Sequence, residues 1–386
     1  MKVVIVNEDF GLGGIQRVSK VIGEQLSNEH EIYFYSVFNS ENYYNIERNF
    51  YEGSFSPYFD FVVRGCNKIF KTTESFIRRG KVGQNKYLKL HLIKLLKFMK
   101  DKDIEVVILN GPLLISSIKY LKKKSDIKYV AWIHNNYDIY LNKYTIGYKS
   151  EFLDGLASAD KAVCLTQSDL VNYSKINENM QCIYNPLTID NTFKSTLKVN
   201  NISFTGRLSF EHKGIDYLLS VASMLPDNWT ISIAGGGTDS EVEKLKKLIQ
   251  EEGLEKKVIF LGSLRGNELQ EHYLNSSIYL MTSRWEGMPL VLAEAMSFGL
   301  PIIAFEQSGS NEVLENGKYG ILVKNGNINE LSDKINSLID SIEEREKYQK
   351  LSNQRLADFD IQNISDTWLN LLEDLKEDID EESYYR

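Results

Sequence analysis

Short apolar runs alternate with amphipathic segments through most of the chain. A continuous apolar run is typical of a strand buried on both faces of a parallel sheet, and apolar positions three or four residues apart predict a helix that covers such a sheet. In the first half this pattern predicts strands at residues 3–6, 31–37, 106–109, 129–134 and 161–165, with helices at 15–26, 87–100 and 115–122. Residues 39–85 break the pattern, and we interpret them as an irregular, aromatic and basic insertion.

The same alternation returns after a polar segment, residues 185–200, that has no periodicity. It predicts strands at residues 202–205, 229–234, 257–261, 278–281, 301–304 and 321–323, with helices at 215–224, 241–251 and 290–298. Strands that alternate with helices in this way indicate βαβ units, and therefore a parallel sheet in each half. A further amphipathic helix is expected at 364–375, and the acidic residues 373–382 look like its solvated end.

A chain of 386 residues is too long for one ordinary core. We therefore predict an α/β protein of two Rossmann-like domains, 1–190 and 198–360, followed by a C-terminal helix and acidic tail at 361–386. Open parallel sheets bind ligands beyond the carboxyl ends of their strands. Two such domains are expected to hold a ligand in a cleft between them.

Composition narrows the class of protein. The content of 42% hydrophobic and 25% charged residues is that of a soluble globular protein. The sequence contains no run of 18 apolar residues, so we predict no membrane span. The first residues read as a strand, because they lack the apolar region and cleavage site of a signal peptide. The three cysteines have no paired spacing and the five histidines give no metal-ligand pair, so we predict a cytoplasmic protein without disulfides or zinc.

Residues 284–296 carry the most informative motif. Glu286 and Glu294 lie eight residues apart, with Gly-Met-Pro between them. Pro289 is suited to the first turn of a helix, which places Glu286 in the preceding loop and Glu294 inside the helix. Two carboxylates near the open amide end of a helix suit a ligand with many hydroxyl groups and a phosphate. An ordinary helix start with a salt-bridged glutamate would give the same residues.

Two glycine-rich segments follow predicted strands and precede helices. Residues 11–14 read Gly-Leu-Gly-Gly, in which Gly13 and Gly14 would let the backbone approach an anion. A dinucleotide fingerprint is not favoured, because Gln16 stands where the third glycine belongs. In the second half Gly235 and Gly236 could face a base or a ribose. Plain tight turns explain both segments equally well.

Isolated charged residues and one histidine add candidate chemistry. Arg207 and Lys213 follow the first strand of the second half, and together they could neutralise a diphosphate without a metal. His134 ends a strand of the first half, where it could touch a sugar hydroxyl or share a proton. Ordinary surface charges and a structural histidine are the alternatives. Asp-x-Asp triplets occur at 101–103, 358–360 and 378–380, in polar context that indicates surface charge and not a metal site.

Taken together, these motifs resemble the retaining glycosyltransferases of family 4, which have the GT-B fold. The matching motifs are Gly13-Gly14, Thr205-Gly206-Arg207-Leu208, Lys213-Gly214-Ile215-Asp216, Ala234-Gly235-Gly236-Gly237, Phe260-Leu261-Gly262, Thr282-Ser283-Arg284-Trp285-Glu286-Gly287-Met288-Pro289, Glu294-Ala295-Met296, Gly299-Leu300-Pro301 and Gly320-Ile321-Leu322-Val323. Their order and spacing cover most of residues 200–325. The first half matches only at its glycine loop and around His134.

The resemblance implies a role for each candidate. Arg207 and Lys213 would hold the donor diphosphate, and Glu294 would bind the donor ribose. Glu286, with the backbone after it, would face the donor sugar, and His134 would contact the sugar near the reacting carbon. The other implied donor-binding positions are Gly13, Gly14, Gly235, Gly236, Gly287, Met288, Pro289 and Leu290. The family transfers sugars with retention and needs no metal or other cofactor, and its last helix packs back on the first domain.

Charge suggests a partner for the first half. Residues 1–185 carry a net charge of about +5 and the remaining residues about −13. Residues 64–102 hold about 12 basic and two acidic side chains, interleaved with leucines. Such a segment suits an anionic membrane surface, although a core-facing helix with a solvated basic face would look the same. A nucleic-acid partner is disfavoured by the acidic second half.

The sequence therefore predicts a retaining glycosyltransferase. It would move a hexose or N-acetylhexosamine from a nucleotide sugar, with UDP as the expected carrier, to a glycan acceptor that is expected to be lipid-linked, in bacterial surface polysaccharide synthesis. Peripheral contact with the inner face of the membrane would accompany a lipid-linked acceptor. The alternatives are a nucleotide-sugar epimerase with the same two-domain fold, and a non-catalytic subunit that stabilises a partner transferase.

Overall fold

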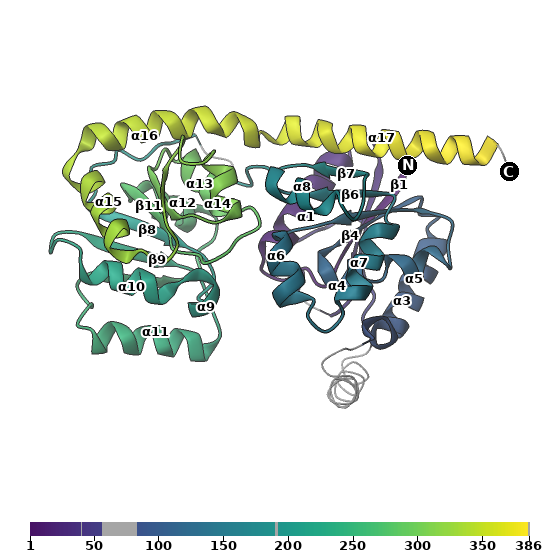
Figure 1. Ribbon diagram of the computed structural model, residues 1–386, viewed down its shortest axis with the longest axis horizontal. Helices are drawn as coiled ribbons and strands as arrows, with labels where there is room; N and C mark the ends of the chain where they lie inside the picture. Colours follow the sequence, from purple (N-terminus) through teal and green to yellow (C-terminus); the bar gives the residue numbers. More distant parts are fainter. Residues whose placement is uncertain (40, 56–82, 190–191, 385–386) are drawn as a thin grey trace. The chain divides into compact units, whose positions relative to one another are not determined.

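The computed structural model describes residues 1–39, 41–55, 83–189 and 192–384, which fold as two units. Unit 1 comprises Met1–Asn185 together with Ile361–Arg386, and unit 2 comprises Pro186–Asp360 (Figure 1). Each unit contains one sheet in which all strand pairs are parallel. The predicted α/β fold with two parallel sheets and a C-terminal helix is confirmed.

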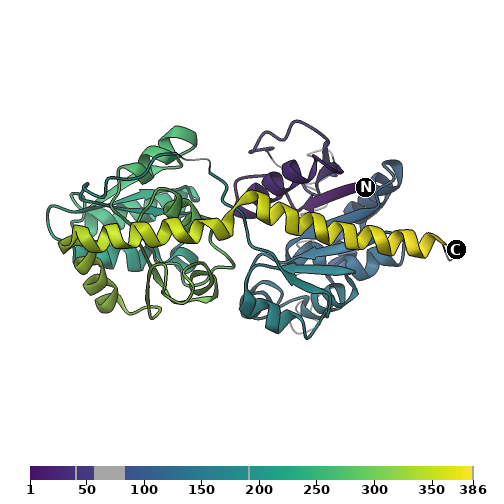
Figure 2. The same ribbon diagram turned by 90° about the horizontal axis from the view of Figure 1, so that it is seen from above.

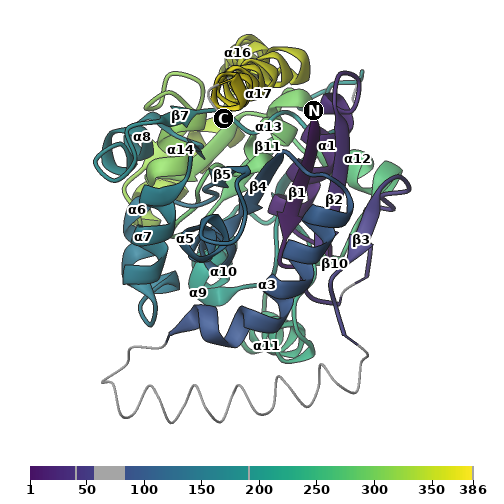
Figure 3. The ribbon, with the colours of Figure 1, turned by 90° about the vertical axis from the view of Figure 1, so that its right-hand side faces the viewer.

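The described part of unit 1 contains a seven-stranded sheet in the order β3-β2-β1-β4-β5-β6-β7 (Figure 3). Its strands are β1 (Lys2–Asn7), β2 (Glu31–Ser36), β3 (Phe50–Glu52), β4 (Val106–Asn110), β5 (Lys128–Trp132), β6 (Lys161–Cys164) and β7 (Met180–Cys182). The direction in which successive strands are added to the sheet reverses between β1 and β4, which lie next to each other. Loops that leave neighbouring strands in opposite directions open a crevice at such a switch point.

Helices cover both faces of this sheet. They are α1 (Gly14–Leu26), α3 (Gln84–Asp101), α4 (Gly111–Ile115), α5 (Ile118–Lys122), α6 (Tyr137–Ile139), α7 (Lys149–Ser158), α8 (Gln167–Tyr173) and α17 (Ile361–Tyr384), with a π-helical turn, η1 (Tyr140–Tyr144). On one face Val4 and Val6 pack in a buried cluster with residues of α3, α4, α5 and α7. On the other face α1 lies so close that a side chain at Gly23 would meet Phe34 and Ile5.

The C-terminal helix belongs to unit 1. Figure 2 shows α17 as one continuous helix along this unit. The fully buried indole of Trp368 lies 4.5 Å from that of Trp132 at the end of β5. Lys161 and Asp374 form an ion pair of 2.9 Å farther along the helix. Burial of this large aromatic side chain helps to fix α17 to the core of unit 1.

The described part of unit 2 contains a six-stranded sheet in the order β10-β9-β8-β11-β12-β13. Its strands are β8 (Asn201–Thr205), β9 (Thr230–Ala234), β10 (Val258–Gly262), β11 (Ile278–Met281), β12 (Ile302–Phe305) and β13 (Ile321–Val323). Its helices are α9 (Phe210–Lys213), α10 (Ile215–Ser223), α11 (Asp239–Glu251), α12 (Gly266–Leu274), α13 (Leu290–Ser297), α14 (Ser308–Val313), α15 (Ile328–Asp340) and α16 (Ile342–Arg355), with a 3₁₀ turn, η2 (Leu356–Phe359). The switch point of this sheet lies between β8 and β11.

Several expected elements differ from the structure. The helix expected at 115–122 is two short helices, because the hydroxyls of Ser116 and Ser117 donate to the carbonyls of Leu113 and Leu114 and so compete with helical bonds. The helices that were not predicted are α6, α7, α8, α9, α12, α14, α15 and α16. The region read as an irregular insertion contains β3, and residues 56–82 lie outside the described part. Pro289 is the residue before α13 and not part of its first turn.

Candidate active site

The loops that follow β8, β9, β11 and β12 meet at the carboxyl edge of the unit 2 sheet, and two glycines allow their close approach. Gly214 has φ of 64° and separates α9 from α10, and a Cβ there would lie 2.2 Å from the carbonyl oxygen of Thr282. Gly235 has φ of 150°, and a Cβ there would lie 1.8 Å from the carbonyl oxygen of Gly206. Only glycine fits either position. Close packing against Gly206 therefore explains the glycine at position 235 without any role in ligand binding.

Lys213 and Glu286 form a buried ion pair at the switch point. Lys213 Nζ lies 2.5 Å from Glu286 Oε1, although the two residues are 73 positions apart in the chain. The side chains are only 14% and 11% exposed. Lys213 ends α9 after β8, and Glu286 lies in the loop after β11, so the pair joins the two strands at which the sheet reverses order.

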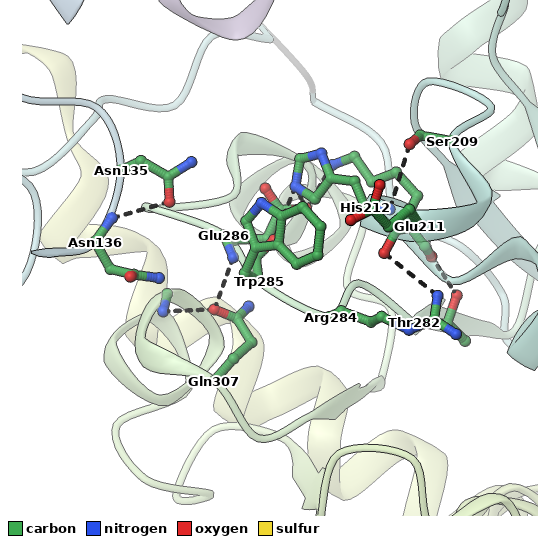
Figure 4. A network of polar contacts seen from close by, with 12 residues as sticks. Asn135, Asn136, Ser209, Glu211, His212, Thr282, Arg284, Trp285, Glu286 and Gln307 are labelled. Atoms are coloured by element: carbon green, nitrogen blue, oxygen red, sulfur yellow. Dashed lines mark hydrogen bonds and ion pairs between the residues drawn. The ribbon is translucent and has the colours of Figure 1, made fainter. Parts of the chain in front are cut away.

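His212 and Gln307 hold the loop that carries Glu286 (Figure 4). His212 Nε2 donates to the carbonyl of Trp285 at 2.8 Å, and its ring stacks on the Trp285 indole with centroids 4.8 Å apart. Gln307 Oε1 accepts from the backbone amides of Glu286, at 3.1 Å, and Gly309, at 2.8 Å. The backbone of Glu286 is therefore fixed from β12 as well as from β8.

Arg284 ties the same loop to α10. Its guanidinium makes two bonds to the carboxylate of Asp216, of 2.6 and 3.1 Å, and lies 4.0 Å above the ring of Tyr217. It also donates to the carbonyl of Phe210 at 2.6 Å. A planar guanidinium that is ion-paired, stacked on a ring and hydrogen-bonded to a backbone carbonyl has little conformational freedom. Arg284 therefore supports the loop that carries Glu286.

The charges around Glu286 keep it ionised. Burial by itself would raise the pKa of the Glu286 carboxyl, but the ammonium of Lys213 and the hydrogen-bonding His212 outweigh that effect and lower the pKa to about 2. A carboxylate whose pKa is lower in the folded than in the unfolded protein stabilises the fold above the unfolded pKa. This stabilisation is lost as the pH falls from the ordinary value of 4.5 toward 2.

We expect the Glu286→Gln variant to show this stabilisation directly. The shift corresponds to roughly 3 kcal/mol, so at pH 7 the variant should lose unfolding free energy of that order. The loss should shrink as the pH falls below about 4.5, where the wild-type carboxylate gains a proton on unfolding. Denaturant titrations at several pH values measure it. Glu344→Gln, which breaks the exposed Glu344–Lys347 pair, should change little, and equal stability of wild type and Glu286→Gln at pH 7 would contradict the account.

Glu294 lies inside α13, as predicted, and is 2% exposed. Its Oε1 accepts from the hydroxyl of Thr188 at 3.2 Å, and its Oε2 accepts from the hydroxyl of Tyr273 at 3.0 Å. Burial raises the pKa of Tyr273 well above its ordinary value, so the phenol stays protonated and donates. Both carboxylate oxygens therefore accept hydrogen bonds from hydroxyl groups of unit 2 itself.

The other predicted residues of unit 2 line the same edge. Arg207 follows β8 with an exposed side chain, and no ion pair joins it to the described residues. Gly236 follows β9 beside Gly235. Gly287, Met288 and Pro289 are buried, and Leu290, the first residue of α13, is half-buried. The structure therefore brings Arg207, Lys213, Glu286 and these backbone segments to one edge of the sheet.

The glycine loop of unit 1 follows β1 and starts α1. Gly13 precedes the helix, and its amide and carbonyl both bond to the hydroxyl of Tyr44, at 3.3 and 2.8 Å. Gly14 is the first helical residue and is exposed. Gly14 is thus the better placed of the two to approach a ligand, because the polar groups of Gly13 have a partner within the unit.

His134 follows β5 near the switch point of unit 1 and is 9% exposed. Its Nε2 lies 2.7 Å from Oδ1 of Asn110, the last residue of β4, and its ring packs 4.7 Å from that of Trp132. The hydroxyl of Tyr140 accepts from its backbone amide at 3.3 Å. Burial lowers the pKa of His134 to about 3, so the imidazole is neutral at physiological pH.

Sequence reasoning missed the residues that support the candidates. His212, Gln307, Thr188, Tyr273 and Asn110 contact predicted site residues, but nothing in their own spacing marks them. His212 had the clearest signal, because it directly precedes Lys213. Gln307 precedes a helix that was not predicted, and Thr188 and Tyr273 reach Glu294 from distant segments.

The acidic triplets do not contribute a metal site in the described residues. They lie at the end of α3, at η2 and in α17. Among the described histidines, cysteines and carboxylates, no group of three or more is placed to hold a metal ion. Likewise, none of the described helices is both long enough and apolar enough to cross a bilayer.

Comparison with known proteins matches the sequence of this chain to one family. The family model for glycosyl transferases group 1 matches residues 188–355, which contain all the candidates of unit 2. An uncharacterised glycosyltransferase of Haemophilus influenzae is 32% identical over 290 residues, covering 72% of this chain and 79% of the relative. The lipopolysaccharide 1,6-galactosyltransferase of Salmonella typhimurium is 26% identical over 274 residues, covering 69% of this chain and 71% of the relative.

A solved structure resembles the whole chain. The Anabaena protein HepE, in complex with UDP and glucose, has a TM-score of 0.77 and 17% sequence identity, with 97% of this chain and 99% of the other covered. At this identity the likeness shows the fold alone. The Haemophilus relative and the family model establish that this chain belongs to the group 1 glycosyltransferases, and the structural likeness shows that it has their GT-B fold.

Proposed function

We propose that this glycosyltransferase moves a hexose or N-acetylhexosamine from a UDP-linked donor to a glycan acceptor, with retention and without a metal, as in family 4. The buried Lys213–Glu286 pair at the switch point of unit 2 is the observation that carries the proposal. It presents a cation and a carboxylate at the edge where open parallel sheets bind their ligands. A diphosphate next to a sugar needs both kinds of group.

The cations would bind the donor diphosphate. An ammonium has three donors, so Lys213 can keep its bond to Glu286 and still donate to a phosphate oxygen. Arg207 lies at the end of β8 with an exposed guanidinium, which suits bidentate contact with a phosphate. In unit 1, Gly14 at the start of α1 would let the backbone approach the phosphates.

The carboxylates would bind hydroxyl groups of the donor. Glu294 would exchange the hydroxyl of Thr188 for those of the ribose, since its two oxygens already accept from hydroxyls. Glu286, ionised and held by its backbone, would face the sugar together with the backbone of residues 287–290. His134 would contact the sugar near the reacting carbon, and Gly236 would lie near the base or ribose.

Retention would follow from attack on the same face that the leaving diphosphate vacates. The leaving phosphate oxygen would accept the proton of the acceptor hydroxyl as the new glycosidic bond forms. Positioning and charge stabilisation can supply most of the acceleration of such a step, so no nucleophilic side chain is needed. A pair of ionised residues fixed before the donor binds is the kind of preorganised site that this chemistry requires.

A binding screen tests the donor. Calorimetry with UDP, UDP-hexoses, UDP-N-acetylhexosamines and the matching GDP and ADP compounds should show UDP compounds binding most tightly. Preferential binding of another nucleotide would contradict the UDP assignment, and binding of none would contradict the donor site.

We expect activity to persist in excess EDTA. Lys213, Arg207 and the amide ends of helices provide the positive charge that a divalent ion provides in metal-dependent transferases. Turnover should therefore change by less than about twofold when chelator is added to enzyme dialysed free of metals. Loss of turnover that magnesium or manganese restores would contradict this prediction.

The acceptor is proposed to be a lipid-linked glycan of bacterial surface polysaccharide synthesis. The Salmonella relative named above acts on lipopolysaccharide, as its name states. In this chain, helix α3 presents one exposed face that combines basic and apolar side chains. This face consists of Lys86, Lys89, Leu90, Ile93, Lys97 and Lys100. Leu90 and Ile93 are 43% and 47% exposed, and apolar side chains among lysines suit an anionic membrane surface.

The opposite face of α3 is buried in unit 1, so the helix is amphipathic and packs its apolar face against the core of this unit. Lys94, which lies between the two faces, has a structural role. Its Nζ donates to the carbonyl of Ser54 at 2.6 Å and lies 3.6 Å above the ring of Phe55. Lys94 is therefore excluded from the membrane-facing set, and residues 64–82 of the basic segment lie outside the described part.

We expect the exposed face of α3 to bind anionic vesicles. Each lysine near such a surface contributes about 1 kcal/mol, so changing Lys89, Lys97 and Lys100 to glutamate should abolish flotation with phosphatidylglycerol vesicles. Salt should weaken the wild-type binding, and neutral vesicles should bind little. The matched control changes Lys119, Lys123 and Lys124, on and after α5 of the same unit, to glutamate. Equal flotation of both variants, or no flotation of the wild type, would show that this face of α3 does not bind the membrane and only contacts solvent.

A further inference from the structure

The side-chain amide of Asn110 lies between a backbone carbonyl and the His134 ring. Its Nδ2 donates to the carbonyl oxygen of Val6 at 3.3 Å, and its Oδ1 lies 2.7 Å from Nε2 of His134. Asn110 is 2% exposed and His134 is 9% exposed. The contacts connect the ends of β1, β4 and β5, the three strands around the switch point of unit 1.

These two contacts determine the orientation of the amide and the tautomer of the histidine. A backbone carbonyl only accepts hydrogen bonds, so the amide nitrogen of Asn110 must face Val6. Its oxygen must then face His134, and because this oxygen also only accepts, Nε2 of His134 must carry a hydrogen. In a neutral imidazole the other nitrogen, Nδ1, then has a lone pair and no hydrogen.

The Nδ1 atom remains available to a ligand. No hydrogen bond joins it to the described residues, and it is not among the buried side-chain atoms that lack a partner, so it is in contact with solvent. Burial of the ring disfavours the imidazolium form. At neutral pH, Nδ1 can therefore accept a hydrogen bond but cannot donate one.

We propose that Asn110 is a positioning residue that holds His134 in the Nε2–H tautomer, so that Nδ1 accepts a hydrogen bond from a hydroxyl group of the donor sugar. The identity of the ligand in this inference rests on the proposed function, whereas the tautomer of His134 does not. It gives His134 one defined role, recognition of a sugar hydroxyl. It excludes proton donation from Nδ1 to the leaving phosphate.

Nitrogen NMR on the full chain with ¹⁵N-labelled histidine tests the tautomer without any ligand. The chain has five histidines, and the His134→Gln variant identifies the resonances of His134. Wild type should show a protonated Nε2 and an unprotonated Nδ1. A protonated Nδ1, or an even mixture of tautomers, would overturn the inference. Since this measurement needs neither turnover nor donor, it remains decisive if the proposed function fails.

Variants test the positioning role. Asn110→Ala should populate the Nδ1–H tautomer and weaken binding of UDP-glucose or UDP-N-acetylglucosamine by about tenfold, the effect of one lost hydrogen bond, while UDP binding stays unchanged. Asn177→Ala is the matched control. Asn177 is buried in the same unit and donates to the carbonyls of Leu156 and Ala159, far along the chain from His134. It should leave the tautomer and the sugar preference unchanged.

The sugar contact has its own readout. Adding UDP-glucose or UDP-N-acetylglucosamine to the wild type should shift the Nδ1 resonance toward that of a hydrogen-bonded nitrogen, and UDP alone should not. Absence of this shift with both sugar nucleotides, or an equal shift with UDP, would overturn the proposed hydroxyl contact. An unchanged tautomer in a folded Asn110→Ala variant would overturn the role of Asn110.

Discussion

The Arg207→Ala and Lys213→Ala variants should each weaken UDP binding by on the order of tenfold to a hundredfold. Hydrogen bonds to charged groups contribute roughly 1.5–3 kcal/mol, and a factor of ten in affinity is about 1.4 kcal/mol. We expect Lys213→Ala to have the larger effect, because it also leaves the buried carboxylate of Glu286 unpaired beside a diphosphate. Isothermal titration calorimetry with UDP measures both.

Two controls separate binding from folding. Lys256→Ala removes an exposed lysine just before β10, at the opposite edge of the same sheet, and should leave UDP affinity unchanged. Lys213→Ala combined with Glu286→Gln removes both charges, so it should recover stability relative to Lys213→Ala alone without recovering UDP affinity. A folded Arg207→Ala, Lys213→Ala double variant that binds UDP normally would disprove the diphosphate site.

Replacing Trp368 by alanine should have the largest effect on stability. The side chain is fully buried against Trp132, and loss of a buried tryptophan costs about 3–5 kcal/mol through lost burial and the cavity that remains. Because Trp368 belongs to unit 1, hydrogen exchange should speed up in β5 and β6 while the strands of unit 2 keep their protection. Mass spectrometry of peptides from each unit measures this directly.

Trp368→Phe serves as the matched variant. The indole nitrogen of Trp368 is buried without a hydrogen-bond partner among the described residues, so phenylalanine removes only part of the ring and no hydrogen bond. It should cost much less than alanine. Equal loss of protection in both units after Trp368→Ala would show that α17 does not stabilise unit 1 selectively.

The sequence was sufficient to predict the two sheets and the edge at which the candidates lie. Buried parallel strands are continuous apolar runs, and eleven of the thirteen strands were predicted near their observed positions in the described part of the chain. Missed β3 and β7 lie at the two ends of the unit 1 sheet and have only three residues each. Strands this short carry little periodicity, as do the short helices α12 and α14.

The polar contacts of the site could not be predicted in the same way. The motif placed Glu286 in a loop and Lys213 before a helix, but their pairing depends on β8 and β11 being neighbours in the sheet. The Asn110–His134 contact likewise depends on the β4–β5 pairing, which sets Asn110 opposite Trp132. Nothing in the local sequence of either residue carries that information. Long-range pairs of this kind require the fold before they can be recognised.

A transfer assay with product analysis tests the central claim most directly. The enzyme is incubated with the UDP-sugar selected by the binding screen and with bacterial lipid extract, in EDTA, and the products are analysed by mass spectrometry and NMR. We predict release of UDP and a glycolipid that carries one more sugar in the anomeric configuration of the donor. An epimerised sugar without an acceptor product, turnover only in the presence of a partner protein, or a product with inverted configuration would contradict the account.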